Sequence, residues 1–224
     1  MLRVVSANLR RGLADAGAFA ALVRELDATV LAVQELGPQQ AEQLARLFPH
    51  GKLEPTPEGT GLGIALRHPG DVERLALPER DAQVARLRAG DWPGMSRDVE
   101  VVNAHLANPV IGTPASWRFR RGQVDGIAAY LSSAEPCPRL LVGDLNATPR
   151  WPAYRRLAAE LDDAALLAAA RHGRTAERTW GPYPGSPRLL RIDHVLVDGL
   201  DVLDFRLVSI AGSDHSAVVA DLVV

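Results

Sequence analysis

The stretch LLVGDLN, residues 140–146, joins a short apolar run to two polar residues, Asp144 and Asn146. An apolar run of this kind, bounded by glycine, is typical of a buried β-strand. Polar residues at the end of such a strand lie at the edge of a sheet, where α/β proteins place their functional sites. The stretch therefore predicts a strand over residues 140–142 whose end carries catalytic or binding groups.

Other apolar runs are bordered by polar residues in the same way. The strand-like runs cover residues 2–7, 30–33, 63–66, 99–104, 192–197, 202–208 and 217–224. The polar residues within or beside them include Asn8, Glu35, His105, Asp193, Asp214 and His215. Burying one carboxylate without a partner is costly, so several carboxylates at one sheet edge indicate a metal site or a proton-transfer network.

Segments with helical spacing lie between some of these runs. The predicted helices cover residues 16–26, 38–48, 114–131 and 152–159, and the last three begin with a proline near the first helical turn. Residues 53–90 instead carry short alternating pieces with almost no helical pattern. The sequence thus predicts a mixed α/β sandwich with strands inside and helices outside. A length of 224 residues fits one domain, residues 1–224.

Charge and cysteine content limit the classes of function. The chain has 25 Lys plus Arg residues and 27 Asp plus Glu residues, so no long-range field draws it to nucleic acid or to an anionic membrane. Binding of a polyanion would depend on local patches. The single cysteine, Cys137, cannot form an internal disulfide, and no apolar stretch is long enough to span a membrane. We therefore expect a cytoplasmic protein without membrane insertion.

The order of these motifs resembles that of the endonuclease/exonuclease/phosphatase superfamily, which contains deoxyribonuclease-I-like nucleases, AP endonucleases, sphingomyelinases and inositol polyphosphate phosphatases. The similar segments are Ser6–Leu9, Gln34–Glu35, Gly61–Leu66, Asn103–Leu106, Arg120–Gln123, Gly143–Asn146, Arg191–His194 and Ser213–Ser216. The segments at 143–146 and 213–215 are the most specific. The resemblance spans nearly the whole chain and implies a four-layer α/β/β/α sandwich, with two mixed β-sheets flanked by helices.

A metal site is expected because oxygen and amide ligands without a Cys/His cluster suit a hard cation. Glu35 is the leading ligand, since it is the strand-end acid of the second motif. Asn8 and Asp214 complete the expected set, either as direct ligands or by orienting bound water. We expect Mg²⁺, for which Mn²⁺ can substitute.

The resemblance also implies catalytic roles for five residues. Asp144 positions or deprotonates the attacking water, and Asn146 orients that water or the phosphate. Asp193 orients His215, whose imidazole binds a phosphoryl oxygen or moves a proton. His105 is expected to be a second donor to the phosphate. The sequence does not identify an acidic partner for His105.

Three arginines are candidates for substrate binding, because the planar guanidinium group suits phosphate. Arg120 belongs to the predicted helix after the His105 motif, whereas Arg188 and Arg191 precede Asp193. For Arg120 a supporting role is as consistent with the sequence as solvent exposure, and for the other two a packed loop is nearly as consistent.

The expected activity is metal-assisted hydrolysis of a phosphodiester or phosphomonoester, with nuclease activity the first specific hypothesis and nucleic acid one candidate partner. Leu36-Gly37 follows Glu35 where AP endonucleases extend Gln-Glu to Gln-Glu-x-Lys, and residues 191–194 differ from the Trp-Cys-Asp-Arg element of inositol 5-phosphatases. Both departures argue against those branches. The alternatives are a small-molecule or lipid-headgroup phosphoesterase and a non-catalytic binding module. Protein partners are not indicated.

Overall fold

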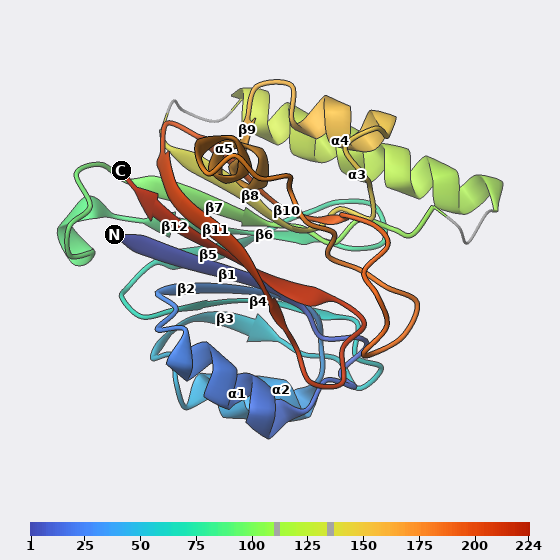
Figure 1. Ribbon diagram of the computed structural model, residues 1–224, viewed down its shortest axis with the longest axis horizontal. Coiled ribbons are helices and arrows are strands. Elements are labelled where there is room, and N and C mark those ends of the chain that lie inside the picture. Colours follow the sequence, from blue (N-terminus) through green and yellow to red (C-terminus); the bar gives the residue numbers. More distant parts are fainter. Residues whose placement is uncertain (110–112, 134–136) are drawn as a thin grey trace.

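Two β-sheets that pack face to face form the centre of the structure (Figure 1). The computed structural model describes residues 1–109, 113–133 and 137–224. Sheet A has the strand order β11-β12-β1-β2-β4-β3, with bounds β1 Leu2–Asn8, β2 Val30–Leu36, β3 His50–Glu54, β4 Gly61–Leu66, β11 Asp201–Ser209 and β12 Ser216–Val223. Sheet B has the order β5-β6-β7-β8-β10-β9, with bounds β5 Asp71–Leu75, β6 Ala82–Leu87, β7 Val99–Asn103, β8 Arg139–Asp144, β9 Asp162–Asp163 and β10 Asp193–Asp198.

Helices cover the outer faces of both sheets (Figure 1). Helices α1 (Ala16–Glu25) and α2 (Pro38–Ala45) lie on sheet A, whereas α3 (Pro114–Ser133) and α4 (Pro152–Leu157) lie on sheet B. Helix α5 (Ala164–Arg171) packs beside β10 and β11. Each sheet is mixed, because β1 pairs parallel with β2 and β7 parallel with β8, while the other pairs are antiparallel. The predicted four-layer sandwich is therefore confirmed.

Three clusters of buried apolar side chains fill the three spaces between these layers. The central cluster joins the inner faces of the sheets through residues such as Val4 and Val142. A second cluster packs Phe19 of α1 and Leu44 of α2 against sheet A, and a third packs α3 and α4 against sheet B. Within the described residues, no helix combines the length and apolar character needed to cross a membrane.

The structure differs from the sequence prediction mainly where elements are short. Strands β3, β5 and β6 lie in or beside the region read as alternating pieces, and a 3-10 turn spans Ala89–Asp91. Helix α5 was not predicted. It begins without a proline, at Asp163, whose side chain accepts hydrogen bonds from the backbone N–H groups of Ala165 and Leu166. A strand of two residues, β9, directly precedes it, so no clear boundary marks the helix in the sequence.

A buried polar bridge joins the two sheets close to the functional edge. The Gln34 side-chain amide in β2 donates to Asn103 Oδ1 in β7 at 2.8 Å and to Ser6 Oγ at 3.1 Å. The Asn103 amide donates in turn to the carbonyl oxygens of Val33 and Gly63. Because buried polar groups are stable only when paired, this bridge favours one relative position of the sheets.

Candidate active site

The polar strand ends of both sheets meet at one edge of the sandwich. In sheet A, Asn8 and Glu35 lie at the ends of the parallel strands β1 and β2. His215 directly precedes β12, which runs antiparallel to β1. In sheet B, Asp144 at the end of β8 pairs with Asp193 at the start of β10. Strand direction thus brings groups from distant parts of the sequence to one edge.

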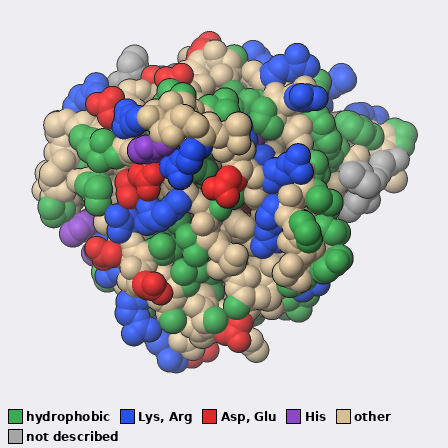
Figure 2. Space-filling view, in the orientation of Figure 1, with side chains coloured by type: hydrophobic (Ala, Val, Ile, Leu, Met, Phe, Trp, Pro, Cys, Tyr) green, Lys and Arg blue, Asp and Glu red, His purple; other side chains and the backbone are tan. Residues whose placement is uncertain are grey.

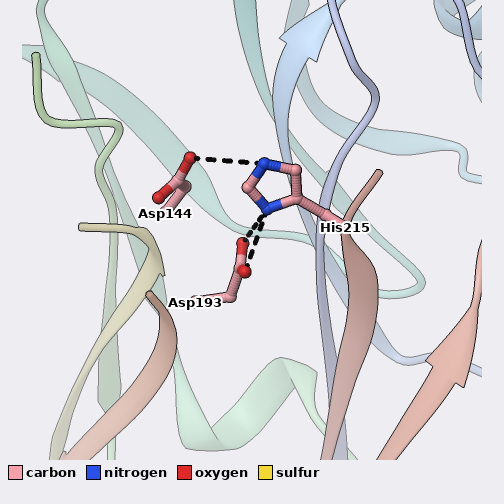
Figure 3. Close-up of side chains that lie close together, drawn as sticks. All are labelled: Asp144, Asp193 and His215. Atoms are coloured by element: carbon pink, nitrogen blue, oxygen red, sulfur yellow. Dashed lines mark hydrogen bonds and ion pairs between the residues drawn. The ribbon is translucent and has the colours of Figure 1, made fainter. Parts of the chain in front are cut away.

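The imidazole of His215 lies between two carboxylates (Figure 3). Its Nδ1 is 3.0 Å from each carboxylate oxygen of Asp193, and its Nε2 is 3.9 Å from Asp144 Oδ2. All three residues are buried. A carboxylate that accepts the Nδ1 hydrogen holds the ring orientation and leaves Nε2 free to face a substrate.

The electrostatics of these three residues are coupled. Burial lowers the pKa of His215, but the charge and hydrogen bond of Asp193, with a contribution from Asp144, outweigh burial and raise the pKa to about 9. Burial and the neighbouring Asp193 raise the pKa of Asp144 to about 7, although His215 acts in the opposite direction. A cationic His215 therefore lies beside a carboxyl group that can accept or release a proton near neutral pH.

Two asparagines orient the Asp144 carboxylate. The Asn146 backbone N–H donates to Asp144 Oδ1 at 2.8 Å, and the Asn8 side-chain amide donates to Oδ2 at 3.0 Å. Asn8 Oδ1 accepts from the Arg10 N–H, and the Asn146 amide donates to the Leu106 carbonyl. These bonds hold Asp144 with its carboxylate toward the cavity.

Glu35 is aimed at the same cavity by an unusual backbone conformation. It lies at an irregularity in the β2–β4 pairing, and its φ angle is +55°. Its Oε2 accepts from the Arg11 N–H at 2.5 Å, in a turn where Arg10, Arg11 and Gly12 have φ angles of +50°, +51° and +69°. A left-handed conformation costs a non-glycine residue about 1–2 kcal/mol, so the surrounding structure must stabilise this turn.

His105, two residues beyond β7, contacts a cation as well as carboxylates. Its Nε2 is 3.5 Å from Asp144 Oδ2 and 3.7 Å from Glu35 Oε1. Arg80 Nη1 lies 2.9 Å from His105 Nδ1 and 3.2 Å from Nε2. Burial, together with the positive charges of Arg80 and His215, holds the pKa of His105 well below its usual value. His105 is therefore neutral at physiological pH.

A cavity of about 900 Å³ opens over these residues. It is lined by the site residues Glu35, His105, Asp144, Asn146, Asp214 and His215, by the cations Arg10, Arg11 and Arg80, and by the aromatic residues Phe119, Trp151 and Trp180. A larger cleft of about 1510 Å³ is lined by residues of β5, β6 and the start of β7, without this set of converging groups. We therefore place the site in the smaller cavity.

The family of this chain follows from a comparison with known protein families. The model of the endonuclease/exonuclease/phosphatase family matches residues 5–215. The chain belongs to this family. No curated protein matches the sequence at a significant level.

Solved structures of other family members share the fold. A 3′-5′ exonuclease from Neisseria meningitidis superposes with a TM-score of 0.77 at 19% identity, covering 100% of both chains. D. rerio TDP2, complexed with a single-strand DNA product, has a TM-score of 0.74 at 17% identity, covering 100% of this chain and 99% of the other. The mannosyl-6-phosphatase Bt3783 of Bacteroides thetaiotaomicron has a TM-score of 0.69 at 16% identity, covering 100% of both. Such low identities establish the fold alone.

Members of the endonuclease/exonuclease/phosphatase family are phosphoester hydrolases, and the residues here fit a metal ion in two ways. Asp144, Asp193 and His215 each offer one ligand atom within 4.8 Å of the others. Asp193, however, already accepts from His215 Nδ1. Glu35 Oε1 accepts no hydrogen bond from the described residues and faces the cavity, so it is the better anchor for a hard cation.

Asp214, the third expected metal ligand, also lines this cavity. Its Oδ2 accepts from the Trp180 indole N–H at 3.0 Å, and its Oδ1 lies 3.9 Å from Arg10 Nε. Of the other two expected ligands, Asn8 is buried beneath Asp144, with its carboxamide bonded on both sides. The structure therefore places Glu35 and Asp214 in the lining of one cavity and Asn8 against Asp144, another residue of that lining.

The three arginines expected to bind substrate, Arg120, Arg188 and Arg191, are not among the residues that line the cavity, and each contacts other parts of the protein. Arg120 donates to the backbone carbonyls of Ala107, Leu145 and Asn146. Arg188 donates to the carbonyls of Asp214 and His215 and to Ser216 Oγ. Arg191 forms a 2.6 Å ion pair with buried Asp163. Their guanidinium groups contact backbone or side-chain oxygens of the protein, Arg120 and Arg191 from buried positions and Arg188 from a partly exposed one.

The cavity arginines were not identified from the sequence. Arg10 and Arg11 directly follow the Asn8 motif, so their position beside the end of a strand could have identified them as residues of the site. Arg80 lies in a segment without any motif, between β5 and β6. Its position became evident only from the packing of that segment.

We expect Asp163→Asn to lower the melting temperature by about 5–15 °C. Asp163 accepts from Tyr154 Oη and Arg191 and lies 3.8 Å from His194 Nδ1, and removing one partner of a buried ion pair costs about 3–5 kcal/mol. Burial raises the pKa of Asp163, but His194 and Arg191 hold it below its usual value. The stabilisation is thus fully present above the unfolded-state pKa and is lost as pH falls through the lower folded-state pKa.

The measurement is thermal unfolding of the wild type and the variant at neutral pH and at successively lower pH. Asp71→Asn, which breaks the exposed ion pair with Arg88, is the matched control and should change the melting temperature little. Equal melting temperatures for Asp163→Asn and the wild type would contradict a stabilising role for this cluster.

Proposed function

We propose that this protein is a Mg²⁺-dependent phosphoesterase that cleaves phosphodiester or phosphomonoester bonds by attack of water, with nuclease activity as the first specific hypothesis. Mn²⁺ can substitute. The observation that carries the proposal is the buried Asp193–His215–Asp144 arrangement beside the free Glu35 oxygen in one cavity. Membership of the family supports hydrolysis of a phosphoester.

In the proposed reaction each residue acts on water or on phosphate. Asp144 accepts a proton from the attacking water, for which its raised pKa is suited. His215, held by Asp193, donates from Nε2 to a phosphoryl oxygen and offsets the growing negative charge. Asn146 orients Asp144. Glu35 and Asp214 would hold Mg²⁺, which would supply positive charge to neutralise the phosphate and stabilise the leaving oxygen.

The related structures support two different classes of substrate. The exonuclease and the DNA-bound TDP2 favour a nucleic acid, whereas the mannosyl-6-phosphatase favours a small phosphomonoester. Trp151, Trp180 and Phe119 can stack on bases, and this supports a nucleic acid end. Basic and acidic side chains are interspersed on the face drawn in Figure 2. The net charge of −2 gives no long-range field that would attract a long duplex, so a short or terminal substrate is favoured.

The proposal is tested by a screen for metal-dependent turnover. Plasmid DNA, single-stranded DNA, RNA, nucleotides, sugar phosphates and phospholipid headgroups are incubated with Mg²⁺, with Mn²⁺ and with a chelator. We expect turnover of at least one phosphoester that the chelator abolishes. Metal binding without turnover of any of them would favour the alternative of a non-catalytic binding module.

The absence of an internal disulfide partner for Cys137 supports a cytoplasmic location for this activity.

Salt dependence is expected to separate nucleic acids from small substrates. If Arg10, Arg11 and Arg80 contact three phosphates of single-stranded DNA, the logarithm of the binding constant should fall with the logarithm of salt concentration with a slope of about −2. The measurement is fluorescence anisotropy of a labelled oligonucleotide between low and physiological salt. A flat response on the best substrate would instead favour a small phosphoester.

A further inference from the structure

Arg80, the cation beside His105, has no carboxylate partner among the residues that the structure describes. Arg80 is half-buried, lines the active-site cavity and contacts both ring nitrogens of His105. In the described part of the chain, no carboxylate oxygen lies within 4.0 Å of its guanidinium nitrogens, although Glu35 and Asp144 lie 3.7 and 3.5 Å from His105 Nε2. A guanidinium group at a cavity wall without a counter-ion is suited to an anionic ligand.

Packing against α3 holds the segment that carries Arg80. Leu77 and Pro78 pack closely against two glycines of α3. A Cβ atom at Gly122 would lie 2.8 Å from Pro78 Cγ, and one at Gly126 would lie 2.6 Å from Leu77 Cδ2, so larger residues would clash at both positions. Gln123 between them donates to the Pro78 carbonyl at 3.0 Å. Arg80 thus comes from an anchored segment whose approach depends on small residues in α3.

Gln123 also connects this segment to the His105 loop. Its Oε1 accepts from the Ala107 N–H at 2.8 Å, so one side chain holds both the segment before Arg80 and the backbone after His105. Gln123 therefore holds in place both of the segments that meet in the contact between Arg80 and His105. Such preorganisation lets a group bind charge without the cost of reorienting at the moment of reaction.

We propose that Arg80 binds the phosphoryl group of the substrate, donating to its non-bridging oxygens, and that His105 is a positioning residue that holds this guanidinium in place. The inference rests on the proposed function and assigns its phosphate-binding cation. The contacts of 2.9 and 3.2 Å between Arg80 Nη1 and the His105 ring place the imidazole where it can hold the guanidinium. His215 and Arg80 both line the cavity in which the phosphoryl group would bind.

The test measures binding of inorganic phosphate by calorimetric titration in the presence of Mg²⁺, together with kcat/KM on the best substrate. We expect Arg80→Met to weaken phosphate binding about tenfold or more and to lower kcat/KM about 10²- to 10³-fold, the range for removal of one donor to transition-state charge. Arg80→Lys should recover part of both losses, because it restores a point charge but not the planar fork. Arg88→Met, which removes an exposed arginine remote from the cavity, is the matched control and should change neither value.

A double-variant cycle tests the positioning role of His105. His105→Ala should lower phosphate affinity and kcat/KM when Arg80 is present, and should lower them little further in the Arg80→Met background. A residue that merely supports the fold would lower the melting temperature without this coupling. Additive losses would assign His105 an independent contact with the phosphate and overturn its positioning role.

Binding and turnover separate failure of this inference from failure of the proposed function. If the wild type hydrolyses phosphoesters, but Arg80→Met and Arg80→Lys retain wild-type phosphate affinity and kcat/KM, the Arg80 assignment is overturned and the function stands. If no phosphoester is hydrolysed, but phosphate binding depends on Arg80, the function fails and the anion site stands. A wild type that binds no phosphate overturns the assignment. Circular dichroism of each variant identifies unfolded samples, and Arg80→Gln then replaces Arg80→Met.

Discussion

Glu35→Gln is expected to lower metal-dependent turnover by about three orders of magnitude while leaving the fold intact. A metal that stabilises the charge of the transition state contributes several kcal/mol, and each 1.4 kcal/mol corresponds to about tenfold in rate. The carboxamide opens no cavity, and its oxygen can still accept from the Arg11 N–H, so the turn that holds Glu35 is preserved. The change removes charge and little else.

Metal titrations with Mg²⁺ and Mn²⁺, turnover and melting temperature are measured on the same preparations. Glu42→Gln is the matched control, because Glu42 forms an exposed ion pair with Arg46 on α2, away from the cavity. The control should behave as the wild type. Unchanged metal affinity and turnover in Glu35→Gln would exclude Glu35 as a ligand and would leave the Asp144, Asp193 and His215 group as the remaining candidate.

The second large effect is expected from Asp193 and His215, which should act as one unit. Asp193→Asn and His215→Ala should each lower turnover by about two to four orders of magnitude, the range of general acid-base groups. The physical reason is the paired contact at 3.0 Å, which fixes the imidazole and favours its cationic form. Once either partner is absent, the other has little left to contribute.

The double variant Asp193→Asn/His215→Ala should therefore lose little more activity than the worse single variant. Turnover normalised to folded enzyme and the melting temperature are measured for all three variants. A purely structural role would lower the melting temperature while the remaining folded enzyme keeps nearly normal turnover. Losses of activity that simply multiply would contradict the idea of a coupled pair.

Much of the fold and the main site follow from the sequence for one physical reason. Residues such as Asp144 and Glu35 interrupt apolar runs, and a buried charge at the end of a strand has few explanations other than function. Strand direction then determines that these ends meet at one edge. The order of the motifs indicated the resemblance that implies two mixed sheets flanked by helices, and the family match over residues 5–215 agrees with that resemblance.

The remaining parts depend on contacts that no local pattern records. Arg191 stands two residues before Asp193, yet its guanidinium pairs with Asp163, a residue far away in the sequence, and not with a group of the cavity. Arg80 reaches His105 only because Gly122 and Gly126 lie one helical turn apart on α3 and admit the segment from Leu77. These contacts join residues that are far apart in the chain, and no local pattern in a single sequence predicts them.

The connectivity of sheet A has a consequence for the biosynthesis of the protein. Strands β1 to β4 are translated first, but their neighbours β11 and β12 leave the ribosome only after every strand of sheet B. Until then β1 presents an unpaired edge, the kind of surface that promotes aggregation of nascent chains. His215 arrives with the last of these strands. A chain whose translation stops early therefore lacks His215, the proposed phosphate-binding imidazole, and we expect such a partly synthesised chain to be inactive.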